Sequence, residues 1–86
     1  KGPSRELEAY TGAYTNPAYG KLSVTLENGG LVAQWSSFSS PLEHFHFDTF
    51  VGKAENSFEN APIVFTLNAD GEVAQLHGFD VDFKRG

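Results

Sequence analysis

Three side chains that can bind a metal ion stand at alternate positions near the middle of the chain. They are His44, His46 and Asp48, and His77 is available from a later segment. Alternate residues of a β-strand project from one face, so these imidazole and carboxylate groups would share one direction. Residues four apart on a strand are separated by roughly 13 Å, whereas Zn²⁺ ligands lie at about 2.0 to 2.2 Å. We therefore predict an outward polar face here, and neither a metal site nor another cofactor.

Hydroxyl groups that might serve as nucleophiles lie close to these histidines in the sequence. They belong to Ser36, Ser37, Ser39 and Ser40, around Phe38. A nucleophilic serine needs a base that is itself oriented by a third group, and the sequence contains neither a Gly-x-Ser-x-Gly elbow nor a Ser-x-x-Lys pair. We interpret the four serines as loop residues and predict no catalytic residue in this chain.

A second set has the residue types of a small-ligand pocket: Trp35, Tyr10, Tyr14 and Glu43. Glu43 shares strand parity with Phe45 and Phe47, so we expect it to face inward, where a carboxylate must be hydrogen-bonded or neutral. The rings would either contact an apolar ligand or fill the core with their polar atoms bonded. Core packing is the favoured interpretation, and ligand binding is the alternative.

The first set, without His77, and Glu43 of the second set lie in the run PLEHFHFDTF at residues 41–50. As a strand, this alternating run places Phe45 and Phe47 on the inner face and the histidines on the outer face. Phe50 then falls on the parity of the histidines. A bulge or tight turn at residues 48–49 is the simplest explanation for the break.

Other alternating runs flank this strand, at residues 10–14, 21–27, 31–36, 49–51, 63–67, 72–77 and 79–84. Turn signals separate them at Asn16-Pro17, at residues 28–30 and at residues 68–71. Residues 52–61 have no period and form the longest expected loop. Ser4 is a candidate N-cap for one or two helical turns before the first strand.

Eight short strands with frequent turns predict an all-β fold, and we expect a small eight-stranded antiparallel barrel with a short N-terminal helical turn. A barrel of this size is filled by side chains or holds one small ligand, and its closure removes free strand edges. The residues expected to face inward are Tyr10, Tyr14, Leu22, Val24, Leu26, Leu31, Trp35, Phe45, Phe47, Ile63, Phe65, Leu67, Val73, Phe79, Val81 and Phe83.

Composition limits the classes of partner. The 86 residues suffice for one small domain, which we place at residues 7–86 after a linker or remnant at residues 1–6. The net charge is −5, and four of the six basic residues lie near the two ends. No basic patch is available for nucleic acid or an anionic membrane, and no apolar run approaches the length of a membrane span. The lack of cysteine excludes disulfides and thiolate metal sites.

Several motifs together resemble one family. They are Leu7-x-x-Tyr10-x-Gly12-x-Tyr14, Tyr19-Gly20, the run at residues 41–50 and the closing Phe79-x-Val81-x-Phe83. The resemblance extends from Leu7 to Arg85, and the run at residues 41–50 is its most specific part. The family is the lipocalin-like domain of unknown function that follows serine beta-lactamase-like hydrolases, the bacterial relatives of penicillin-binding proteins and esterases.

The resemblance implies a lipocalin-like barrel with an accessory role and no catalytic residues of its own. We therefore expect a non-catalytic C-terminal domain that assembles oligomers, or that docks on the hydrolase domain of the same chain and shapes access to its active site. Self-association is a further expected mode, and an extracytoplasmic location is favoured. The alternative is a barrel that binds a small apolar ligand. The candidate interface residues are His44, His46, Asp48, Phe38 and Phe50.

Overall fold

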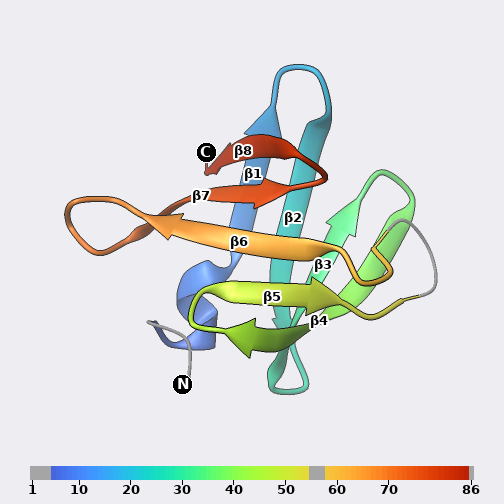
Figure 1. The fold of residues 1–86 in the computed structure, drawn as a ribbon, viewed down its shortest axis with the longest axis horizontal. Coiled ribbons are helices and arrows are strands. Elements are labelled where there is room, and N and C mark those ends of the chain that lie inside the picture. The colour runs from blue at the N-terminus through green and yellow to red at the C-terminus, as the bar shows by residue number, and fades with distance from the viewer. Residues whose placement is uncertain (1–4, 55–57, 86) are drawn as a thin grey trace.

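A computed structural model describes residues 5–54 and 58–85, and over these residues the chain forms a closed antiparallel barrel in which each strand pairs with its neighbours in sequence (Figure 1). This confirms the expected all-β, eight-stranded fold. Its elements are the 3₁₀ helix η1 (Leu7–Tyr10) and the strands β1 (Gly12–Asn16), β2 (Gly20–Glu27), β3 (Gly30–Trp35), β4 (Phe38–His46), β5 (Thr49–Gly52), β6 (Pro62–Leu67), β7 (Val73–Gly78) and β8 (Val81–Arg85).

The helical turn at the N-terminus is confirmed as η1. Its N-cap is Glu6, whose side chain makes no capping hydrogen bond, and the expected cap at Ser4 lies outside the described residues. Each of the three expected turns forms. At the first, the Asn16 side-chain oxygen accepts hydrogen bonds from the backbone N–H groups of Ala18 and Tyr19, at 2.7 and 2.9 Å. Such side-chain bonds explain why asparagine begins a turn.

Two hairpins have consecutive residues in the left-handed region. Asn28 and Gly29 have φ of 52° and 82°, and Phe79 and Asp80 have φ of 54° and 65°. Two consecutive positive φ values belong to the type I′ turn, whose twist matches that of the strands it joins. The Asn28-Gly29 pair is a sequence signal for this turn, whereas the Phe79-Asp80 pair is not. The segment after Gly78 is therefore a tight turn followed by β8, and it is shorter than the strand we expected from residue 79 to 84.

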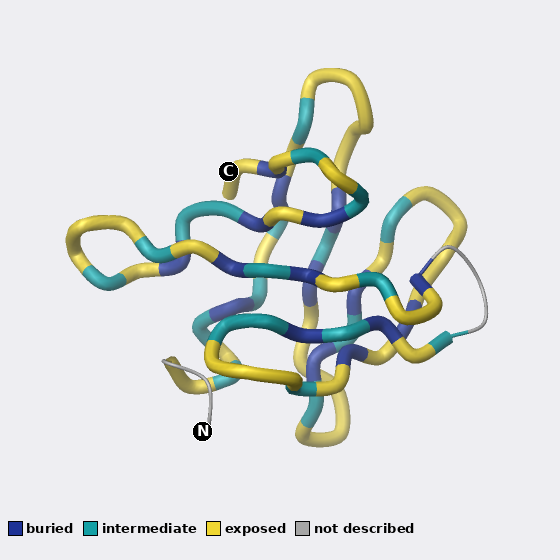
Figure 2. Tube along the Cα trace, in the orientation of Figure 1, coloured by how far each residue is buried: buried dark blue, intermediate teal, exposed yellow. Residues whose placement is uncertain are grey.

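Buried positions recur along the strands of the barrel (Figure 2). Most of the expected inward residues are buried or half-buried, but Leu26 is 43% exposed, Phe45 71% and Phe47 46%. These three predictions are wrong. Leu26 pairs with Leu31 next to the β2–β3 turn, and the two phenylalanines are exposed at the β4–β5 hairpin. The buried residues that the sequence pattern missed are Ser40, Leu42, Phe50, Phe58 and Leu76.

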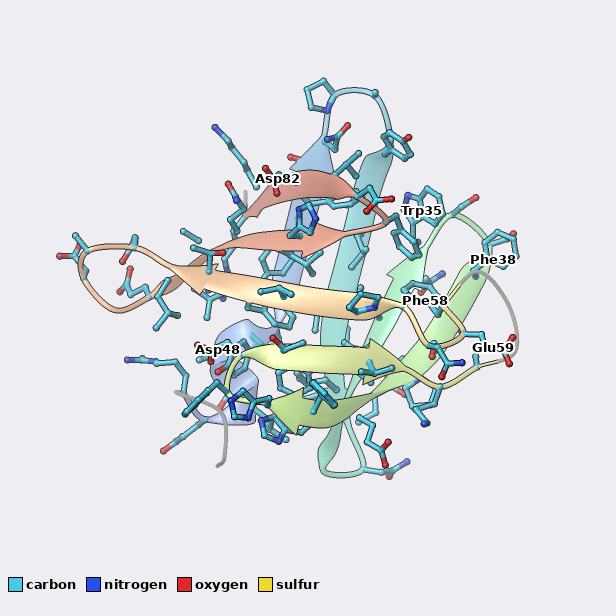
Figure 3. All side chains as sticks on the ribbon, in the orientation of Figure 1. Trp35, Phe38, Asp48, Phe58, Glu59 and Asp82 are labelled. Atoms are coloured by element: carbon cyan, nitrogen blue, oxygen red, sulfur yellow. The ribbon has the colours of Figure 1, made fainter. Side chains whose placement is uncertain are left out.

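Phe58 closes one end of the barrel. It comes from the long loop between β5 and β6, yet it is fully buried, and its ring packs against Phe79 with centroids 5.3 Å apart. Phe79 stacks on Trp35, which in turn stacks on Tyr19, with centroid distances of 4.9 and 6.2 Å. Figure 3 shows Phe58 and Trp35 at the same end of the molecule. Three stacked rings and the edge-on ring of Phe58 therefore cover the end of the barrel away from η1.

Ser40 anchors the start of the same loop. Its hydroxyl is buried, donates to the Pro41 carbonyl at 2.8 Å and accepts from the N–H groups of Lys53 and Ala54, each at 2.9 Å. A buried hydroxyl must find partners, and this one finds three. Ser39 and Ser40 are thus strand residues of β4, and only Ser36 and Ser37 occupy a turn. The interpretation of all four serines as loop residues is wrong for two of them.

Candidate interaction surface

The hairpin formed by β4 and β5 carries most of the residues singled out by sequence. His44 pairs with Phe50 and His46 pairs with Thr49, which leaves Phe45 as the extra residue of a bulge. Phe47 and Asp48 then form the turn, with Phe47 at a φ of 51°. The irregularity we expected at residues 48–49 is therefore a bulge three residues earlier followed by a two-residue turn. A bulge inserts one residue and shifts the phase of the side chains that follow it.

The faces of β4 are opposite to those we expected. Its inward side is set by Ser40 and Leu42, which are buried, and by His44, which is half-buried. Glu43 points outward and lies 3.3 Å from the Lys53 ammonium, in an ion pair that is open to solvent. An exposed pair of this kind contributes little to stability. The prediction of an inward Glu43 is therefore wrong.

The expected outward residues do not share one surface. Phe50 is only 2% exposed, because its ring packs edge-on against Tyr10 and Phe65 with centroids 5.5 and 5.7 Å apart. His44 packs edge-on against Phe50 at 5.3 Å, and its Nε2 lies 2.8 Å from the Phe47 carbonyl oxygen. Phe50 and His44 therefore belong to the interior and its margin, which corrects their outward assignment.

Of the other three candidates, two lie at the β4–β5 turn and the third lies at the far end of β4. Asp48 occupies the β4–β5 turn, His46 is exposed beside it, and Phe38 stands at the opposite end of β4 (Figure 3). Phe38 is 37% exposed, next to Trp35 in the β3–β4 register. Whether any of them contacts a partner stays a prediction.

A hydrogen-bond network ties the β4–β5 turn to the N-terminal segment. The Tyr10 hydroxyl donates to the Asp48 carboxylate and accepts from the Arg5 backbone N–H at 3.1 Å. The Asp48 carbonyl accepts from the N–H of Phe65 at 2.9 Å. One turn residue therefore holds η1, β6 and the start of the described chain together. The spacing of the sequence gave no signal for the pairing of Tyr10 with Asp48, because it joins residues 38 positions apart.

The four residues of the expected ligand pocket are not brought together. Tyr10 and Tyr14 are fully buried in the core, Glu43 is on the outer surface, and Trp35 lies at the far end of the barrel. The Trp35 indole N–H donates to the Tyr19 carbonyl at 2.9 Å, and the rings of Tyr19 and Phe79 both stack on the indole. These rings act as core and as an end cover, so the geometry does not favour the pocket.

Burial also determines the chemistry of Tyr14. Loss of water around the phenolate raises the pKa of Tyr14 to about 12, although the Arg85 guanidinium opposes the rise and Tyr10 adds to it. Its hydroxyl donates to the Tyr10 carbonyl at 2.7 Å. A phenol that stays protonated and hydrogen-bonded in the core serves packing, and its proton is not available near neutral pH.

The histidines do not gather around a common point. His77 Nδ1 lies 2.7 Å from the Asp82 carboxylate on the outer side of β7 and β8, on strands that do not include His44 or His46. Within residues 5–54 and 58–85, no group of three or more His, Cys, Asp or Glu side chains is placed to hold a metal ion. The described part of the chain also contains no helix with the length and apolar character needed to span a membrane.

One surface feature was not expected from the sequence. Phe45, His46 and Phe47, which we call the β4–β5 tip, project from the bulge and turn, with the rings of His46 and Phe47 in edge contact at 4.2 Å. Phe45 is the most exposed of the large hydrophobic side chains described. Alternation alone assigned both phenylalanines to the core. The signal that could have corrected this is the apolar pair Leu42 and Phe50, which requires the opposite face to be the buried one.

Comparisons with known proteins agree with this architecture. The crystal structure of the C-terminal domain of penicillin binding protein Rv0907 superposes with a TM-score of 0.74 at 27% sequence identity, over 98% of this chain and 88% of that one. No curated protein matches the chain. The family model described as "Domain of unknown function (DUF3471)" matches residues 1–85. The chain therefore belongs to the DUF3471 family, and it is similar to a C-terminal domain of a penicillin binding protein.

Proposed function

We propose that this chain is the non-catalytic C-terminal accessory domain of a serine beta-lactamase-like hydrolase, and that it acts by contact with the hydrolase domain that precedes it. The observation that carries the proposal is the similarity to a penicillin binding protein's C-terminal domain over nearly the whole of both chains. A match of this extent covers the barrel as a whole, and it supports the same place in a larger protein.

The state of Ser40 supports a role outside catalysis. This buried serine uses its hydroxyl for three hydrogen bonds to backbone groups and holds the β5–β6 loop. A catalytic hydroxyl must instead reach a base and an incoming substrate. The side chains that remain exposed on the barrel, such as Phe45, are of the kind that binds other protein surfaces.

The full-length protein, treated with a fluorescent penicillin and digested for mass spectrometry, tests the proposal. We expect one acylated serine, upstream of Lys1, within a Ser-x-x-Lys motif of the type that penicillin-binding proteins use. Protein pre-incubated with unlabelled ampicillin is the control and should lose the label. A labelled serine within residues 1–86, or a full-length protein without an upstream hydrolase domain, would overturn the proposal.

A further inference from the structure

The β4–β5 tip presents an apolar surface on an acidic domain. Phe45 and Phe47 are 71% and 46% exposed, in a chain with a net charge of −5. The two acids nearest the tip in sequence are already engaged, Glu43 with the Lys53 ammonium and Asp48 with the Tyr10 hydroxyl. The tip therefore offers two phenyl rings and one imidazole, and its chemistry fits an apolar partner.

The hairpin holds these rings in place. The bulge leaves Phe45 without a partner across the ladder, the Phe47 carbonyl lies 2.8 Å from the His44 ring nitrogen, and the Asp48 carbonyl is bonded to β6. Side chains on an ordered support lose less entropy on binding than those on a loose loop. The tip is thus built as a rigid projection.

The described chain begins beside the same turn. The Arg5 backbone N–H donates to the Tyr10 hydroxyl, which donates to the Asp48 carboxylate next to Phe47. Figure 1 shows η1 alongside the β4–β5 hairpin. A domain that precedes Arg5 is therefore attached to the barrel at the position where the apolar rings project.

The size of the tip favours a tethered partner. Stable complexes between separate proteins bury about 1,600 Å² in total, which two phenylalanines and a histidine cannot supply. A partner on the same chain needs less, because a short connection raises its effective concentration to the order of millimolar. We propose that the β4–β5 tip is the surface on which the domain preceding Arg5 docks, an inference that rests on the accessory role proposed above.

Hydroxyl-radical footprinting of the full-length protein compares two residues of the same type on one strand. In the barrel, Phe45 is 71% exposed and Phe38 37%, so a free tip would be oxidised faster at Phe45. If the tip is docked, the order of the two oxidation rates is reversed, and we expect Phe38 to be oxidised faster than Phe45 by about twofold or more. Faster oxidation of Phe45 would overturn the inference. If Phe45 became more readily oxidised when the protein was diluted, the inference would also be overturned. The surface that covers Phe45 would then belong to a second copy of the protein.

A double variant tests the same surface through the overall dimensions of the full-length protein. In the full-length protein, Phe45→Ser combined with Phe47→Ser should increase the radius of gyration in small-angle scattering, whereas Leu26→Ser, at an apolar side chain 43% exposed on β2, should leave it unchanged. Unchanged hydrogen exchange in β2 and β8 would show that the barrel is intact. An unchanged radius of gyration overturns the inference. If the penicillin label still lies upstream, the accessory role stands and only the docking surface is refuted.

Discussion

At the scale of single residues, the barrel interior depends on two tyrosines whose hydroxyls have separate partners. Tyr14 donates to the backbone of Tyr10, and Tyr10 donates to Asp48. Both rings are fully buried and both pack against Phe65, at centroid distances of 5.8 and 4.8 Å. A buried phenol with a satisfied hydroxyl adds apolar contact without leaving a polar atom unpaired.

The raised pKa of Tyr14 predicts that the protein loses stability in alkaline solution. Burial raises its pKa to about 12 from the ordinary tyrosine value of 10.0, so above pH 10 the unfolded chain releases this proton before the folded one does. The contribution of Tyr14 is fully present below pH 10 and is lost as the pH rises toward 12. We expect the free energy of unfolding to fall by on the order of 2 kcal/mol across this window. Urea titrations at several pH values would measure it.

The matched variant is Tyr14→Phe, which keeps the ring and removes the titrating group. Its free energy of unfolding should be lower at pH 8, by about 1 kcal/mol for the lost hydrogen bond, and should then decline less steeply between pH 10 and 12. Equal slopes for the wild-type protein and the variant would assign the alkaline loss to other groups.

At the scale of elements, the β5–β6 loop and strand β5 form one packed unit. The Gly52 N–H donates to the Ala61 carbonyl, and the Gly52 carbonyl accepts from Asn60, each at 3.0 Å. A Cβ atom added to Gly52 would lie 2.2 Å from the Phe58 carbonyl oxygen. The glycine thus allows the loop to approach the strand closely enough for Phe58 to enter the barrel.

Gly52→Ala is therefore expected to destabilise the barrel. The added methyl group must displace loop backbone or withdraw Phe58, and overpacking of this kind costs about 1 to 3 kcal/mol. The control is Gly30→Ala, where the nearest described contact of the new Cβ is 3.9 Å away and φ is not positive. Thermal unfolding followed by circular dichroism would separate the two, and equal melting temperatures would refute the close approach.

Strand β4 shows what the sequence can and cannot predict. Alternation located the strand and the turn that follows it, because a period of two is visible in any window of residues. The pattern did not say which face is buried, and the phase was taken from Phe45 and Phe47. In the structure, the buried face is the one that carries Leu42 and Phe50, and the bulge at Phe45 interrupts the alternation before Phe47. Such a shift is set by pairing with β5, which a local pattern does not contain.

The candidate site was less predictable than the fold. Phe58 lies in a run without period, so nothing local indicated that its ring fills the barrel end. The link from Arg5 through Tyr10 to Asp48 joins three distant segments. The sequence singled out Tyr10 and Asp48 for separate roles, and their contact follows from the tertiary fold and not from spacing.

At the scale of the whole molecule, closure depends on the seam between β1 and β8. Among the residues that the structure describes, two pairs are in register there, Tyr14 with Arg85 and Thr15 with Lys84. The Arg85 guanidinium extends this contact by donating to the Val73 carbonyl at 2.9 Å and to the Thr11 carbonyl at 2.7 Å. One side chain thereby joins β7, β8 and the segment before β1.

Arg85→Lys should weaken the seam although it keeps the charge. A single ammonium group does not reproduce the planar fork that reaches two carbonyls, so we expect a loss of about 1 to 2 kcal/mol in the free energy of unfolding. Lys84→Arg, at the neighbouring exposed position of β8, is the control and should change little. Chemical denaturation would measure both, and equal midpoints for Arg85→Lys and the wild type would show that the guanidinium is not needed for closure.

The seam also has a consequence for the order of events during folding. Every other strand pair joins neighbours along the chain, whereas the Arg85 contact with Thr11 spans 74 positions. Closing so long a segment costs more entropy than forming a hairpin, so the strands should assemble one after another before the ring of strands closes. Contacts that form after the transition state affect the unfolding rate more than the folding rate. In stopped-flow experiments, Arg85→Lys should therefore speed unfolding and leave the refolding rate nearly unchanged.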